Sequence, residues 1–197
     1  MARWQPNAQE RLVKAALELY AERGFDETAA ADIAARADLT ERTFFRYFAD
    51  KREVLFSGSA ELLATVLAHV ASAPAKQRPL AVVTAAYAAT SEMFQKRRSF
   101  AKVRWAVIEA NAALQERELI KMTSFAAAIA VALRERSVPA AAAVLAGEMG
   151  TTIFKLAFER WVKGSEKKDL AFHIAAVRDE MVAVAVTDFR HTPLRQT

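Results

Sequence analysis

Cationic and hydroxyl side chains occur at helical spacing in residues 40–51, which read T-E-R-T-F-F-R-Y-F-A-D-K. Phe44 and Phe48 are four residues apart, so they share one face of a helix. The opposite arc carries Arg42, Thr43, Arg46 and Tyr47. In a DNA major groove, guanidinium groups reach guanine edges or phosphates, hydroxyls reach phosphates, and aromatic edges meet thymine methyl groups. The pattern therefore predicts a helix that contacts duplex DNA.

The elements that would hold this surface are short helices, the last two of them joined by a tight turn at residues 37–39. Gly24 is the expected stop of a first helix. Thr28 is the expected N-cap of a second helix, and Thr40 is the expected N-cap of a third. This layout predicts a helix-turn-helix.

The proposed DNA-binding segment is not basic overall. The whole chain has a formal net charge of +5, but residues 1–56 hold nine Lys and Arg against ten Asp and Glu, which gives −1. Residues 40–52 hold four cationic and two acidic residues, which gives +2. A positive footprint is thus confined to the predicted recognition helix and the residues after it. Because one copy would bind DNA weakly, we expect binding as a dimer.

The remaining sequence also favours helices, because Ala, Leu, Glu, Lys and Arg dominate and strand signals are nearly absent. Residues 50–53 have the spacing of a capping box, and prolines at 74 and 79 bracket the clearest break. The predicted fold class is all-α, with about nine helices. They are expected over about residues 7–23, 28–37, 40–48, 51–71, 79–96, 99–112, 115–136, 139–163 and 167–190. We expect a helix-turn-helix DNA-binding domain over 1–56 and a helical ligand-binding and dimerisation domain over 57–197.

The last two predicted helices are apolar on nearly all sides. A helix with two apolar faces needs two partners, and the core of its own domain supplies one. We expect the other to be a second copy, in a homodimer held by a four-helix bundle with Gly147 and Gly150 at a close backbone approach. The alternative is that both faces are covered inside one protomer. The expected interface residues are Phe154, Phe158, Trp161, Ile174 and Met181.

Signals of an enzyme, a metal site or a membrane segment are poor. The chain has no Cys, its three His lack metal-ligand spacing, and its five Gly form no phosphate-binding loop. We therefore expect no enzyme activity, no metal and no cofactor. No apolar run approaches the roughly 18 residues of a membrane span, and the start of the chain lacks a signal peptide's apolar stretch. The protein is expected to be cytoplasmic, with no membrane partner.

Aromatic residues and methionines in the middle helices are candidates for a small-molecule site. Rings and flexible thioethers line many such pockets, and an arginine could meet an anionic group. Ordinary core packing is the alternative for most of them. The candidate residues are Phe94, Arg104, Trp105, Met122 and Phe125.

Three segments in order resemble the N-terminal DNA-binding domain of TetR/AcrR-type transcriptional regulators. They are A-L-E-L-Y-A-E-R-G-F-D-E-T (16–28), D-I-A-A-R-A-D-L-T (32–40) and R-T-F-F-R-Y-F-A-D-K-R-E-V-L (42–55). The resemblance covers about a quarter of the chain, and the other three quarters match only in length, helical character and the apolar final helices. Two departures are Asp38, where the family commonly has glycine, and the alanines at 29 and 31, which remove side-chain phosphate contacts.

The resemblance implies a set of DNA-contacting residues, namely Thr28, Thr40, Arg42, Thr43, Phe45, Arg46, Tyr47 and Lys51. On this basis Arg42, Thr43 and Arg46 would reach bases or phosphates, and Phe45 would meet a base or the groove wall. Tyr47 would contact a phosphate, and Lys51 would hold the DNA backbone beside the start of the helix over 51–71.

The expected function is therefore a ligand-responsive transcriptional regulator, most simply a repressor that binds a palindromic operator as a homodimer and responds to an unidentified small-molecule effector. The alternative is a helical small-molecule-binding protein with little or no DNA binding, because residues 1–56 are slightly acidic and the second helix begins with alanines. Salt-dependent binding to a palindromic duplex separates the two.

Overall fold

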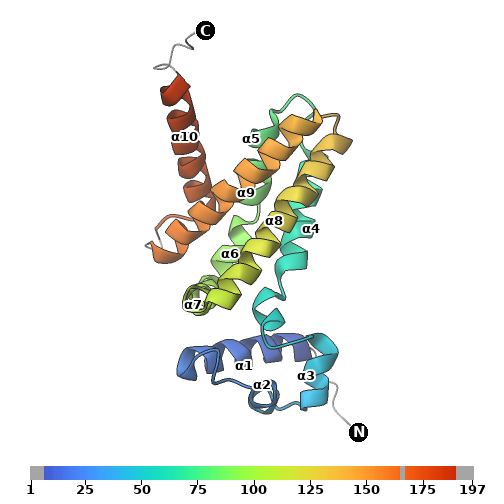
Figure 1. Ribbon diagram of the computed structural model, residues 1–197, viewed down its shortest axis with the longest axis vertical. Helices are drawn as coiled ribbons and strands as arrows, with labels where there is room; N and C mark the ends of the chain where they lie inside the picture. The colour runs from blue at the N-terminus through green and yellow to red at the C-terminus, as the bar shows by residue number, and fades with distance from the viewer. Residues whose placement is uncertain (1–6, 165–166, 190–197) are drawn as a thin grey trace, which may run out of the picture. The chain divides into compact units, whose positions relative to one another are not determined.

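The computed structural model describes residues 7–164 and 167–189, and over these ranges the chain forms helices and turns without a strand (Figure 1). In chain order the elements are α1 (Ala8–Arg23), α2 (Ala30–Arg36), α3 (Glu41–Tyr47), η1 (Glu53–Phe56), α4 (Ser59–Ser72), α5 (Pro79–Ala88), α6 (Ser91–Lys96), α7 (Arg98–Glu109), α8 (Ala112–Glu135), α9 (Ala140–Lys163) and α10 (Leu170–Phe189). The predicted all-α fold with an N-terminal helix-turn-helix is confirmed.

The chain divides into two compact units that do not follow a single cut in the sequence. Unit 1 comprises Met1–Glu61 and Ser99–Ile120, and unit 2 comprises Leu62–Arg98 and Lys121–Thr197. Most of α7 and the start of α8 therefore belong with the helix-turn-helix. The boundary expected near residue 56 takes no account of this second segment.

The core of unit 1 joins the helix-turn-helix to α7 and α8. Leu12 and Leu19 of α1, Ile33 of α2 and Phe44 of α3 are buried in one hydrophobic cluster. Val107, Ile108 and Leu114 belong to the same cluster. Full burial of a large apolar side chain stabilises the folded state by roughly 1.5–3 kcal/mol, so these residues hold α7 in the unit.

The turn between α2 and α3 uses a residue in the left-handed region. Asp38 has φ +55°, which Asp tolerates better than most residues because its side chain bonds locally. The guanidinium of Arg11 on α1 donates to the carbonyl of Ala37 and pairs with the Asp38 carboxylate at 3.6 Å. Asp38 thus adopts the left-handed geometry at a position where the family commonly has glycine, and a charged contact from α1 holds the turn.

Two of the expected helices are interrupted. The helix predicted over 51–71 is the short 3₁₀ helix η1, a turn at residues 57–58, and then α4. The helix predicted over 79–96 is divided into α5 and α6 at residues 89–90. At the first break, Arg104 of α7 donates to the carbonyl of Leu55 at 2.6 Å and lies over the Phe56 ring. This bond gives a carbonyl of η1 a side-chain partner outside the helix.

In unit 2, α9 is the central helix, packed by α5, α8 and α10. Trp161 is fully buried. The Arg98 guanidinium lies over its ring and donates to the carbonyls of Trp161 and Gly164 at 2.6 and 2.9 Å. A Cβ on Gly147 would come within 2.6 Å of the Ala126 carbonyl oxygen, and one on Gly150 would overlap Val83. Both glycines therefore serve close packing inside one protomer, which corrects the expectation that they lie at a dimer interface.

Two segments, Glu53–Ser72 and Ala140–Lys163, are long and apolar enough by composition to cross a membrane. This corrects the expectation that no such stretch exists. The first is divided between η1 and α4, and the second is α9. Because ten residues of α9 are buried, its apolar character is that of a core helix.

Candidate nucleic-acid interface

The recognition helix α3 presents two chemically different faces. Phe44 and Phe48 are buried, with ring centroids 5.5 Å apart. Phe45 and Tyr47 are 52% and 41% exposed, and Arg42 is exposed with them. The buried and exposed arcs are those expected from the sequence, while contact with DNA stays a prediction.

Thr40 closes the start of α3. Its Oγ1 accepts a hydrogen bond from the backbone N–H of Thr43 at 3.2 Å, and the two hydroxyl oxygens are 3.0 Å apart. The predicted N-cap is confirmed. Both hydroxyls therefore lie together at the first turn of the helix.

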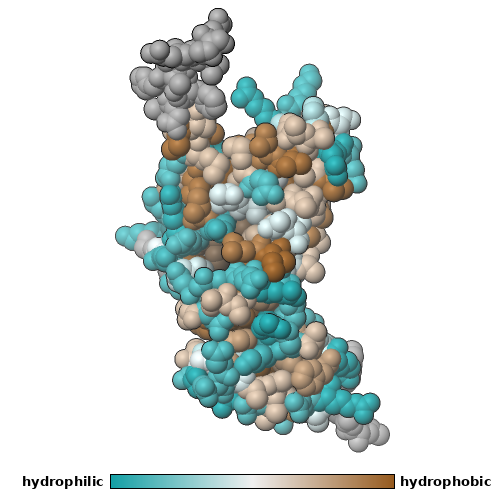
Figure 2. All heavy atoms as spheres, in the orientation of Figure 1, coloured by the Kyte–Doolittle hydropathy of each residue, from teal (hydrophilic) through white to brown (hydrophobic). Residues whose placement is uncertain are grey.

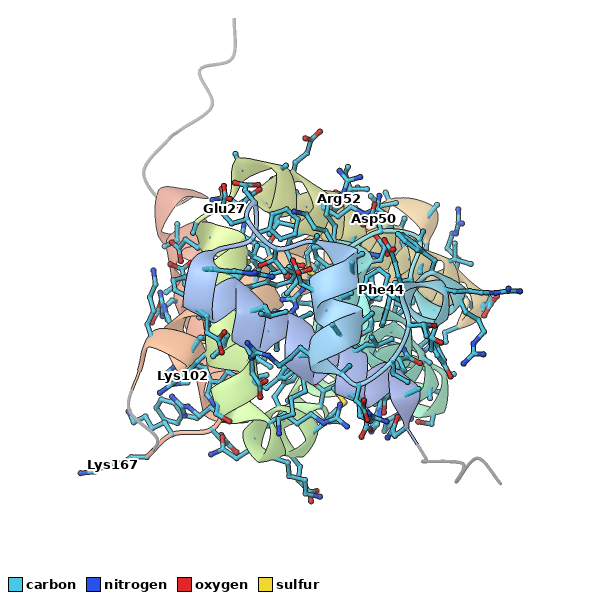
Figure 3. All side chains as sticks on the ribbon, turned by 90° about the horizontal axis from the view of Figure 1, so that it is seen from below. Glu27, Phe44, Asp50, Arg52, Lys102 and Lys167 are labelled. Atoms are coloured by element: carbon cyan, nitrogen blue, oxygen red, sulfur yellow. The ribbon has the colours of Figure 1, made fainter. Side chains whose placement is uncertain are left out.

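Most cations of the helix-turn-helix are neutralised by nearby carboxylates. The pairs are Arg11–Asp38, Lys14–Glu18, Arg23–Asp32, Arg36–Glu22 and Arg52–Asp50, at 3.6, 3.9, 2.6, 2.8 and 2.9 Å. Figure 3 shows the last pair side by side. Hydrogen bonds from Arg36 lower the pKa of the Glu22 carboxyl below its ordinary value. Among the residues that the structure describes, Arg42 and Arg46 have no carboxylate partner, so the net −1 of residues 1–56 does not describe the surface of α3.

Arg46 and Tyr47 form a pair on the exposed side of α3. The Arg46 guanidinium carbon lies 5.0 Å from the centre of the Tyr47 ring, and its Nη2 donates to the phenol oxygen at 3.4 Å. A guanidinium over an aromatic face is held in place while most of its N–H groups stay open to other acceptors. The pair is thus restrained but still able to bind phosphate or a base edge.

Lys51, expected to contact the DNA backbone, uses its ammonium group inside the protein. Nζ donates to the carbonyls of Phe25, Asp26 and Thr28 at 2.9, 3.1 and 3.0 Å. An ammonium has three N–H donors, so none is left for a phosphate. This geometry argues against the expected role. Lys51 also does not begin a long helix, because η1 starts at Glu53.

Thr28 also differs from its expected role. It is buried, and its hydroxyl donates to the carbonyl of Gly24 at 2.8 Å. The N-cap of α2 is Ala29, whose backbone N–H donates to Asp32 Oδ2 at 3.0 Å. The local sequence could not distinguish these two, because both residues lie just before an alanine-rich helix. Thr28 is therefore not placed to reach a phosphate.

The residues expected to line a small-molecule site fall into both units. Arg104 and Trp105 belong to unit 1, whereas Phe94, Met122 and Phe125 belong to unit 2. Arg104 already pairs with Glu118 at 2.7 Å and bonds the Leu55 carbonyl, so its charge is compensated within unit 1. Phe94 is part of an aromatic cluster with Tyr87, Phe154, Phe158 and Trp161. Phe125 is buried in the core of unit 2.

Three of the expected dimer residues are packed inside a single protomer. Phe154, Trp161 and Ile174 are 5%, 0% and 2% exposed, whereas Phe158 and Met181 are half-buried. The helices that carry them nevertheless expose other apolar side chains, and Figure 2 shows hydrophobic surface over both. The exposed residues are Val144, Leu145 and Leu156 on α9, and Phe172, Val182, Val184 and Val186 on α10. Helical periodicity predicted that both helices are apolar but assigned their inner face to the partner, and contact of their exposed residues with a second copy stays a prediction.

Two residues that position the interface have no signal in the sequence. Tyr20 donates its hydroxyl to the carbonyl of Lys51 at 2.6 Å, and Arg11 holds the turn before α3. Both partners lie more than 25 residues along the chain. Nothing in the spacing of either residue indicates such a partner.

Comparison with known proteins identifies relatives of this helix-turn-helix. Residues 12–57 match the family model described as bacterial regulatory proteins, tetR family. The HTH-type transcriptional regulator TcmR of Streptomyces glaucescens is 33% identical over 81 residues, which are 41% of this chain and 36% of that protein. The matched segment thus spans about a third of that relative.

Solved structures extend the likeness to most of the chain. Thermus thermophilus FadR, a TetR-family transcriptional repressor in complex with lauroyl-CoA, is 25% identical, with 88% of this chain and 93% of that one covered and a TM-score of 0.53. Bacillus subtilis FadR in complex with stearoyl-CoA is 18% identical, with 88% and 97% covered and a TM-score of 0.61. The second likeness bears on the fold alone.

Proposed function

Because this chain belongs to the TetR family of transcriptional regulators, we propose that it is a repressor that binds a palindromic operator as a homodimer and releases it when a small molecule binds. Like its relatives, this chain is assigned to the DNA-binding regulators and not to the enzymes. Thr40, Arg42, Thr43, Phe45, Arg46 and Tyr47 form the proposed DNA-binding surface.

The charge distribution of the helix-turn-helix supports this proposal most directly. The cations of α1 and α2 are paired with carboxylates, and those of α3 are exposed without one among the described residues. Arginine is the side chain most often used to read guanine and to bind phosphate. The uncompensated charge is therefore concentrated on the helix whose length and polarity suit a major groove.

A second copy of the chain is the proposed partner of α9 and α10. Residues 182–186 of α10 are five consecutive Val and Ala residues, all exposed. An apolar helix segment that is open to water on all sides gains stability when another chain covers it. In such a homodimer two α3 helices would enter successive major grooves, roughly 34–36 Å apart or a multiple of that.

A fatty acyl-CoA thioester is the first effector to test. Two FadR structures similar to this chain hold lauroyl-CoA and stearoyl-CoA. In this chain, the aromatic cluster of unit 2 around Phe94 and Phe158 offers half-buried rings to an apolar ligand. This proposal replaces Arg104 as an anchor, since its guanidinium is paired.

The function is tested by selecting duplexes from a random library with the wild-type chain and then measuring affinity at several salt concentrations. A repressor selects a palindrome, and its affinity falls steeply with salt because phosphate contacts release counterions. Adding lauroyl-CoA should weaken the binding. If no sequence is enriched and binding does not depend on salt, the chain is a ligand-binding protein without DNA binding.

A further inference from the structure

The side chain of Lys51 fills a cage formed by the loop between α1 and α2. Its Nζ donates to the carbonyls of Phe25, Asp26 and Thr28, at 2.9 to 3.1 Å. The same atom lies 4.4 Å from the centre of the Phe25 ring. A compact ammonium on a flexible stem suits acceptors that converge on one point, so each donor has a partner in the fold.

The backbone of Lys51 is held from the opposite direction. The Tyr20 hydroxyl of α1 donates to the Lys51 carbonyl at 2.6 Å, and the Tyr20 ring meets Phe25 edge-on at 5.2 Å. Tyr20 is buried, which raises the pKa of its phenol and keeps it a donor. The end of α1, the following loop and residue 51 are therefore connected through both the side chain and the main chain of Lys51.

This connection joins the elements on either side of the recognition helix. Lys51 follows the last residue of α3, Tyr47, by four positions. The loop that it holds leads directly into α2, whose first turn starts after Ala29. We infer that Lys51 is a positioning residue, which fixes the start of α2 against the end of α3 and does not itself contact a phosphate. Its consequence for operator affinity rests on the proposed DNA binding.

Two substitutions separate positioning from contact. Lys51→Arg keeps the positive charge, but its planar guanidinium cannot donate to three carbonyls that converge on one point. Lys51→Met removes the charge and keeps a similar length. If Lys51 contacted a phosphate, Lys51→Arg would bind like the wild type and Lys51→Met would lower the slope of log affinity against log salt by about one.

The inference predicts a different pattern for the duplex selected by the wild-type chain. At a temperature where each variant is fully folded, both substitutions should weaken binding about tenfold while the salt slope stays at the wild-type value. Arg42→Met should lower that slope by about one, as a lost contact does. Lys76→Met, on an exposed turn of unit 2, should change neither quantity. A reduced slope for Lys51→Met, or wild-type affinity for both variants, would overturn the inference.

Amide hydrogen exchange on the full chain without DNA tests the cage independently of the proposed function. Both Lys51 variants should exchange faster at residues 25–29, whereas Arg42→Met should exchange there like the wild type. Unchanged protection in the Lys51 variants would show that the cage does not hold the loop and would overturn the inference. If the wild-type chain binds no duplex, the proposed function fails, and faster exchange would still support the structural connection.

Discussion

At the scale of single residues, the exposed side of α3 differs from the rest of unit 1 in what its polar groups already bind. Lys51 and Thr28 donate their side-chain hydrogen bonds to backbone carbonyls within the protein. Among the residues that the structure describes, the partner of the Arg46 guanidinium is its neighbour Tyr47, through its ring and its hydroxyl. Side chains with open donors are the ones that can exchange water for phosphate oxygens or base edges.

Replacing Arg46 by alanine should therefore weaken operator binding without disturbing the fold. A phosphate or bidentate base contact is worth about 1–3 kcal/mol, so affinity should fall about tenfold to a hundredfold. A gel-shift titration measures the change, and a thermal melt checks that the folded state is unaffected. Lys76→Ala serves as the control for loss of one exposed cation. Unchanged affinity in the Arg46 variant would remove this residue from the interface.

His173 on α10 gives unit 2 a pH dependence. Its pKa is lowered, first by burial and then by the cations Lys168, Arg98 and Arg160. Between this lowered value and the ordinary value of about 6.5, the unfolded chain binds a proton that the folded chain does not. The contribution of His173 to the free energy of unfolding is thus lost as pH falls below about 6.5.

Urea unfolding of the wild type and of His173→Gln at pH 7.5 and 5.5 measures this contribution. The variant should lose less stability than the wild type over that interval, because glutamine does not titrate. Since the carboxylates are common to both chains, their share of the pH dependence cancels in the comparison. Equal losses in both chains would contradict the lowered pKa.

The limits of prediction for single residues follow from the range of their contacts. The Thr40 cap and the inward Phe44 could be predicted, because a cap and a helical face depend on residues within a few positions. The cage around Lys51 could not, since its carbonyls lie 23 to 26 residues away. Likeness to a family supplied a role for Lys51, and only the geometry could test whether its donors are free.

At the scale of elements, the same distinction explains which helices were predicted correctly. The ends of α1 and α9 follow from Gly24 and Gly164, each of which is the C-cap of its helix. The break after η1 falls at residues 57–58 and includes Gly58, a local signal that the helix predicted over 51–71 did not take into account. Contacts from α7 and α8 hold η1, through Arg104 on the Leu55 carbonyl and Arg117 on Glu53 at 2.6 Å. Gly58 thus marks where the helix can break, and the tertiary contacts of η1, which helical periodicity does not show, hold the break in place.

Close packing of α9 against α5 makes Gly150 a sensitive position. A Cβ there would overlap the side chain of Val83, which is fully buried and stiff at χ1. Overpacking costs about 1–3 kcal/mol, and replacing a helical glycine recovers up to about 1 kcal/mol. Gly150→Ala should therefore lower the free energy of unfolding by about 1 kcal/mol.

A double-mutant cycle with Val83→Ala identifies the cause. Denaturant unfolding should show the cost of Gly150→Ala disappearing when residue 83 is already alanine, because the methyl group then occupies the space left by the valine. A cost that stays the same in the Val83→Ala background would show that the loss comes from another contact of α9.

At the scale of the whole molecule, the number of copies decides whether the helix-turn-helix can bind DNA tightly. Within α1–α3, the cations that have no carboxylate partner among the described residues are Arg42 and Arg46, so one copy offers few exposed cations to phosphates. Two copies on a palindrome double those contacts, and linked binding raises the overall affinity by orders of magnitude. The exposed apolar residues of α9 and α10 and the weak charge of one DNA-binding unit thus both support the proposed dimer.

The dimer proposed through α10 can be tested without DNA. Val184 is 64% exposed, so Val184→Asp places a charge on the surface without opening the core of the protomer. In a dimer that covers this segment, the carboxylate would lose its water and find no partner, which favours separate chains. Light scattering should give about twice the chain mass of 21.7 kDa for the wild type and the single mass for the variant. Ala127→Asp on α8, also an exposed position, should stay dimeric. A Val184→Asp chain that keeps the wild-type dimer mass would place the interface elsewhere. A monomeric wild type would contradict the proposed dimer itself.

If Val184→Asp is monomeric, it should also bind the selected palindrome far more weakly than the wild type, because each chain then engages only one half-site.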